Sequence, residues 1–105
     1  MPYTVDTGVI LWMTPEIKAM LVLLESFFGP AGIPVRITSG LEGAHGYSSL
    51  HYAGRAIDIE KGEDFPKEIF AQILADIRES VRLRSLPIRL SGESDHIHCE
   101  WRYEP

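Results

Sequence analysis

Histidine and aspartate side chains recur in two segments of the chain at spacings that suit metal chemistry. His51 lies seven residues before Asp58, and His98 ends the later segment Asp95–His98. A catalytic zinc site needs three protein ligands and one open position. Two neutral imidazoles and one carboxylate give such a site a net positive charge, which polarises a carbonyl and lowers the pKa of bound water. The pattern predicts a Zn²⁺ site formed by His51, Asp58 and His98.

Two predicted strands position these ligands. Arg55–Glu60 alternates with a period of two, so Asp58 lies on the face opposite to the two isoleucines of this segment. His96–Trp101 alternates in the same way and places both of its histidines and Glu100 on one face. Cys99 then points away from His98, and we interpret it as a small core residue rather than a ligand.

Hydrolysis at such a site also needs a carboxylate that takes a proton from water and passes it to the leaving amine. Asp95 precedes His98 by three residues, and Glu93 precedes His96 by the same interval. Strand parity does not choose between these pairs, because both histidines face the same way. The spacing alone therefore leaves either acidic residue as the candidate base.

Two amphipathic helices are predicted around these strands. The first begins at Thr14-Pro15-Glu16, where Thr caps free amides and Pro suits the first helical position, and stops at Gly29-Pro30. The second is predicted from Asp64 to about Leu83. The expected buried residues are, in the first helix, Ile17, Met20, Leu21, Leu24, Phe27 and Phe28, and in the second, Phe65, Ile69, Ile73, Leu74 and Ile77.

The remaining pattern gives the fold class. Further strands are predicted at Pro34–Ser39 and Pro87–Leu90, and a glycine-rich loop at Gly40–Ser49. The order helix, strand, strand, helix, strand, strand predicts an α+β domain with the helices packed on one face of a largely antiparallel sheet. The 105 residues fit a single domain, residues 1–105.

Composition and charge exclude several classes of function. Ten basic and fifteen acidic residues give a net charge of −5, which does not fit a nucleic-acid-binding protein. The longest apolar stretch, Ala19–Leu24, is too short to span a membrane. Met1–Asp6 does not resemble a secretory signal, so a protein that acts outside the cytoplasm, like a phage lysin, has to be exported or released by another route. The sequence leaves the localisation open, and we expect a monomer.

The two segments together resemble a known family. Ser49–Asp58 matches the pattern S-x-H-x-x-G-x-A-x-D of the zinc D-alanyl-D-alanine peptidases, which include bacterial carboxypeptidases and phage endolysins and share their fold with the Hedgehog signalling domain. Asp95–His98 resembles the second motif, in which an acidic residue stands three positions before the last metal ligand. Ile37–Gly40 resembles the strand end that leads into the site. The resemblance covers about Val35 to Trp101 and implies a Hedgehog/DD-peptidase-like fold.

The resemblance also implies roles for individual residues. His51 and Asp58 correspond to the first two zinc ligands and His98 to the third. Asp95 corresponds to the catalytic acid/base, and His96 to a histidine that in some relatives stabilises the transition state. The implied reaction is zinc-dependent hydrolysis of a peptide bond in peptidoglycan stem peptides, at a bond that involves D-alanine.

One departure from the family pattern bears on the substrate. Relatives carry an aromatic residue and then an arginine directly after the Ser-Gly, where this chain has Leu41-Glu42. That arginine holds substrate or stabilises developing charge, and a planar guanidinium suits a terminal carboxylate. Arg36 and Arg102 are the candidate replacements. The alternative to an enzyme is a zinc-stabilised binding module without catalysis. A third hypothesis is a phage structural or tail-associated module that uses the same hydrolase.

Overall fold

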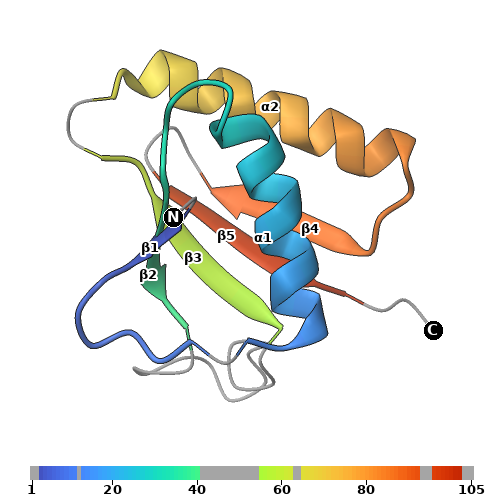
Figure 1. Ribbon diagram of the computed structural model, residues 1–105. Helices are drawn as coiled ribbons and strands as arrows, with labels where there is room; N and C mark the ends of the chain where they lie inside the picture. Colours follow the sequence, from blue (N-terminus) through green and yellow to red (C-terminus); the bar gives the residue numbers. More distant parts are fainter. Residues whose placement is uncertain (1–2, 12, 41–54, 63–64, 93–95, 103–105) are drawn as a thin grey trace.

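The computed structural model describes residues 3–11, 13–40, 55–62, 65–92 and 96–102, and shows an α+β domain (Figure 1). Seven elements follow one another along these residues. They are β1 (Tyr3–Val5), α1 (Pro15–Phe28), β2 (Val35–Ser39), β3 (Ala56–Glu60), α2 (Lys67–Leu83), β4 (Ile88–Gly92) and β5 (His96–Trp101). The predicted strands and helices are therefore all present, and β1 is an addition that the sequence pattern did not predict.

The strands form one five-stranded sheet in the order β1-β2-β3-β5-β4. β1 pairs with β2 in parallel, and the other three pairings are antiparallel. The sheet is thus mixed, and largely antiparallel as predicted. A bidentate ion pair ties the segment after β1 to β2, because Arg36 donates from Nε to Asp6 Oδ1 at 3.0 Å and from Nη2 to Oδ2 at 2.9 Å.

Both helices cover the same face of the sheet. In Figure 1, α1 crosses in front of β5 and β4, and α2 lies beside the upper part of α1. One hydrophobic core joins the buried sides of the two helices to the inward residues of β2, β3, β4 and β5. The fully buried strand residues are Ile37, Ile57, Ile97 and Cys99, with Val35 and Ile59 at 1% exposure. The prediction of helices on one face, and of Cys99 in the core, is confirmed.

The ends of α1 follow the capping pattern. Thr14 Oγ1 accepts a hydrogen bond from the backbone N–H of Ile17 at 3.1 Å, and Pro15 occupies the first turn. The helix ends at Phe28, directly before Gly29. The start at Thr14 and the stop at Gly29 are therefore as predicted.

The second helix differs from its prediction in two respects. It begins at Lys67 rather than at Asp64, because Pro66 adopts an extended conformation immediately before it. Ile69 is 47% exposed, so its predicted burial is wrong, and Phe70 is buried in its place at 1% exposure. Phe70 lies three residues before Ile73 on one helical stripe, whereas Ile69 falls on the flank of the first turn. No helix within the described ranges is long and apolar enough to cross a membrane.

Candidate metal site

The face of the sheet turned away from the helices carries the candidate site. β3 and β5 are hydrogen-bonded neighbours, and their register places Asp58 directly opposite His98. Ser91 of β4 lies opposite His98 on the other side. Because side chains alternate between the two faces of a strand, the buried isoleucines of β3 and β5 direct Asp58 and His98 to the open face. Two residues separated by 40 positions in the sequence thus meet in the interior of the sheet.

An irregularity in β2 lies next to Asp58. The pairing of β2 with β3 shifts register between Ile37 and Ser39, so that Ser39 rather than Thr38 lies opposite Asp58. Thr38 Oγ1 is 3.5 Å from the backbone carbonyl oxygen of Asp58. Bulges of this kind bend a strand and redirect a side chain, and they often occur beside functional sites. The pairing on the outer side of Asp58 is therefore irregular at the level of the site.

His98 is held between two carboxylates. Its Nδ1 lies 2.7 Å from Asp58 Oδ1, and its Nε2 lies 3.1 Å from Glu100 Oε1. Glu100 is the least exposed of the three side chains, at 12% against 31% for His98 and 34% for Asp58. Glu100 also accepts a hydrogen bond from Nε of Arg102 at 2.5 Å. Both ring nitrogens of His98 therefore have a fixed partner.

These contacts shift the pKa values of the groups involved. The hydrogen bond with Asp58 raises the pKa of His98 above its usual value; burial opposes this, and the negative charges of Asp58 and Glu100 reinforce it. Burial acts to raise the pKa of Glu100, but the hydrogen bonds and charges of Arg102 and His98 together outweigh it and leave that pKa below its usual value. Burial raises the pKa of the Cys99 thiol, which is consistent with a core residue.

The described donors fit two positions of a zinc site. Tetrahedral zinc with bonds of about 2.0–2.2 Å separates two ligand atoms by about 3.3 Å, so the Asp58–His98 pair needs to open by about 0.6 Å. If Nε2–H of His98 donates to Glu100, the lone pair of Nδ1 is directed at Asp58, and this is how carboxylates commonly orient metal-binding histidines. Within the described residues, no group of three or more His, Cys, Asp or Glu side chains is arranged to hold a metal ion.

The other predicted site residues are distributed as follows. His96 is exposed at the start of β5, opposite Glu60 and on the same face as His98. Along a strand, side chains two residues apart are separated by about 7 Å, so His96 adjoins the Asp58–His98 pair on the open face. His51 and Asp95, and also Glu93, lie outside the described residues.

Two residues near the site were not assigned a role from the sequence. Glu100 was expected on the face of His98, and its two-residue spacing could have indicated the contact with Nε2. Arg89 of β4 lies opposite Glu100, and only the register of β4 against β5 reveals this position. Of the two candidate replacement arginines, Arg36 is paired with Asp6, whereas Arg102 contacts Glu100.

Comparison of the chain with known protein families, with curated proteins and with solved structures finds no match. The α+β fold and the contact of Asp58 with His98 are therefore properties observed in this chain itself. Any function for the site has to be argued from these residues and from the motif resemblance.

Proposed function

We propose that this chain is a zinc-dependent peptidase of bacterial peptidoglycan stem peptides, on a Hedgehog/DD-peptidase-like fold, with zinc held by His51, Asp58 and His98. One observation carries the proposal. Asp58 and His98 were assigned as ligands from two separate motifs, and their side-chain atoms lie 2.7 Å apart on neighbouring strands. A five-stranded sheet with both helices on one face is compatible with that fold.

The chemistry divides between the metal and the chain. When bound, zinc polarises the peptide carbonyl and lowers the pKa of a water molecule. Glu100 accepts from Nε2 of His98 and so keeps Nδ1 directed toward Asp58. Asp95 takes the proton of the attacking water and delivers it to the leaving amine, so that the C–N bond breaks as the C–O bond forms. His96, on the same face, stabilises the negative charge that develops on the carbonyl oxygen.

A second candidate is a zinc-stabilised binding module without catalysis. The hydrogen-bonded series Asp58, His98, Glu100 and Arg102 links β3 to β5, and a metal there would add stability to a small domain. The Leu41-Glu42 sequence, in place of the aromatic residue and arginine of the family pattern, favours this candidate.

The decisive experiment combines metal analysis with a digest. The protein is reconstituted with zinc, its metal content is measured, and purified peptidoglycan is incubated with it before mass spectrometry of the released muropeptides. We expect about one zinc per chain and cleavage of stem peptides. A folded protein that takes up no zinc overturns the proposal. Stoichiometric zinc without any released product assigns the binding module instead.

The identity of the base is tested on the same digest. Asp95→Asn should keep its zinc and its fold and lose turnover by roughly a hundredfold or more, because no carboxylate then takes the proton. Glu93→Gln, the matched control, removes the same charge two residues away and should cost much less. If Glu93→Gln is inactive and Asp95→Asn is active, the base is Glu93 and His96 replaces His98 as the third ligand.

A further inference from the structure

Helix α1 carries a stripe of accessible residues on the side turned away from the core. This α1 stripe consists of Lys18, Ala19, Val22, Glu25 and Ser26, of which Glu25 is half-buried and the others are exposed. Residues three, four and seven positions apart fall on one side of a helix. Val22, near the middle, is 67% exposed. The stripe therefore has an apolar centre with a charged residue on either side of it.

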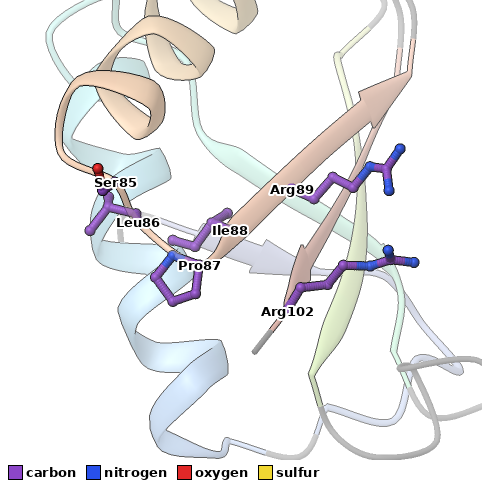
Figure 2. Close-up of a pocket in the computed structure, with 6 residues that line it drawn as sticks. All are labelled: Ser85, Leu86, Pro87, Ile88, Arg89 and Arg102. Carbon is purple, nitrogen blue, oxygen red and sulfur yellow. The ribbon is translucent and has the colours of Figure 1, made fainter. Parts of the chain in front are cut away.

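Two hollows flank Val22. One, of about 490 Å³, lies between α1 and the start of β4, where Leu86 and Ile88 line it. Figure 2 shows these two side chains on the α1 side of β4, whereas both labelled arginines extend the opposite way. The other hollow, of about 360 Å³, lies between α1 and the N-terminal segment, where Tyr3 lines it. Val22 lines both hollows and thus forms a ridge between two grooves, the shape by which helices pack together.

The two charged residues of the α1 stripe do not pair with each other. Lys18 and Glu25 stand seven residues apart, which is about 10.5 Å along the helix axis. Ion pairs within a helix form at spacings of three or four residues, as between Glu79 and Arg82 on α2. Within the described ranges, neither the Lys18 nor the Glu25 side chain takes part in a hydrogen bond or an ion pair. Each charge is therefore available to a group of opposite sign on another molecule.

The α1 stripe is complementary to itself. When two copies of α1 pack antiparallel about a two-fold axis near Val22, each Lys18 faces the partner's Glu25, and the two valines meet at the centre. Ala19 and Ser26 are small, so the two helices can approach closely. A parallel pair would instead bring like charges together. The order of charges along the stripe therefore favours one partner, in one orientation.

We infer that the α1 stripe binds a second copy of this chain in an antiparallel dimer with two-fold symmetry. This differs from the monomer expected from the sequence, and it does not depend on the proposed peptidase function. One pair of 14-residue helices buries less than a standard interface of about 1,600 Å², so the dimer is weak, with a Kd of roughly 10 µM to 1 mM. Because α1 packs on the face of the sheet opposite Asp58 and His98, both candidate metal sites of the dimer stay open.

Exchange of the two charges tests this arrangement. Sedimentation equilibrium over about 10 µM to 1 mM protein should show the wild type approaching the mass of a dimer. Lys18→Glu and Glu25→Lys each turn two attractive contacts per dimer into repulsive ones, so each variant alone should dimerise at least about tenfold more weakly. An equimolar mixture of these variants should associate like the wild type, because both contacts of the mixed dimer are attractive again. The double exchange Lys18→Glu/Glu25→Lys should also restore the dimer.

Matched controls separate these contacts from the effect of net charge. Lys67→Glu and Glu68→Lys make the same charge changes at exposed positions of α2 and should dimerise like the wild type. Circular dichroism establishes that each variant folds. A wild type that stays monomeric throughout the concentration range overturns the inference. So does a Lys18→Glu variant that dimerises as well as Lys67→Glu, or a mixture of Lys18→Glu and Glu25→Lys that fails to associate.

Discussion

Replacing Glu100 by glutamine isolates the contribution of one carboxylate to the metal site. Glu100 Oε1 lies 3.1 Å from Nε2 of His98, and its side chain is only 12% exposed, so water does little to screen the contact. The carboxylate favours the ring orientation that directs Nδ1 at Asp58 and makes the imidazole a stronger donor. Glutamine keeps the shape and an acceptor oxygen but loses the charge.

The expected loss follows from these contacts. Removal of a carboxylate that orients a metal-binding histidine typically lowers metal affinity by about 10- to 100-fold. Because glutamine can still accept from Nε2, we expect Glu100→Gln to lie near the lower figure, about 1.4 kcal/mol. Glu100→Ala, which removes the acceptor as well, should approach the higher one, about 2.8 kcal/mol.

Zinc affinity is measured by competition with a chromophoric chelator at constant pH, alongside thermal melts of the metal-free proteins. Glu60→Gln is the matched control, because Glu60 lies on the same face, is exposed, and pairs across the sheet with His96 rather than His98. We expect Glu60→Gln to bind zinc like the wild type. The reasoning is refuted if folded Glu100→Gln also keeps the zinc affinity of the wild type. Equal losses in both variants would mean that net charge, not the contact with His98, sets the affinity.

Three further changes test other parts of the molecule. His51→Ala should abolish zinc binding, and in the presence of zinc it should melt at a lower temperature than the wild type. With chelator present, the two proteins should melt alike. Equal melting temperatures in both conditions refute the coupling of metal binding to folding. The hydrogen bond from Arg36 lowers the pKa of Asp6 below 3.8 in the folded state; slight burial opposes this shift, and the charge of Arg36 reinforces it. The ion pair therefore stabilises the fold fully above pH 3.8, and this stabilisation is lost as the pH falls through the lowered pKa. Asp6→Asn should therefore cost at most about 1 kcal/mol in urea titrations at neutral pH, and progressively less as the pH falls below 3.8. A difference that stays constant across pH contradicts this. Gly92 has a φ of +137°, and an added Cβ would collide with the carbonyl of His96. Gly92→Ala should therefore lower the free energy of unfolding by more than about 1 kcal/mol. An unchanged urea midpoint would show that β4 can shift there.

Much of the fold could be predicted because the pattern is strong in the central strands. β5 has the predicted bounds, and β3 differs by one residue, since isoleucines alternate with polar residues in both. β1 could not be predicted, because a three-residue strand has no useful periodicity and depends on its parallel pairing with β2. The start of α2 was wrong because Pro66 is extended directly before Lys67, and the burial of Ile69 was wrong because tertiary packing buries Phe70 instead.

The candidate site was predictable in its residue types but not in its contacts. Strand parity places Asp58 and His98 on polar faces of their own strands. That these faces adjoin depends on β5 lying between β3 and β4, and no local pattern encodes this strand order. The same limit applies to Arg89, whose position beside Glu100 follows from the register of β4 with β5. Pairing across strands is a property of the whole chain.

The insertion of β5 between β3 and β4 has a consequence for the order of folding. β4 and β5 are close in sequence and can pair early, whereas β3 is separated from β5 by all of α2, so this loop closes at a larger entropic cost. Asp58 and His98 meet only when that last pairing forms. In a refolding experiment, helical circular dichroism should therefore recover before a zinc-sensitive probe does. Metal added at the start would then act on the docking of β5 against β3 rather than on collapse of the helices.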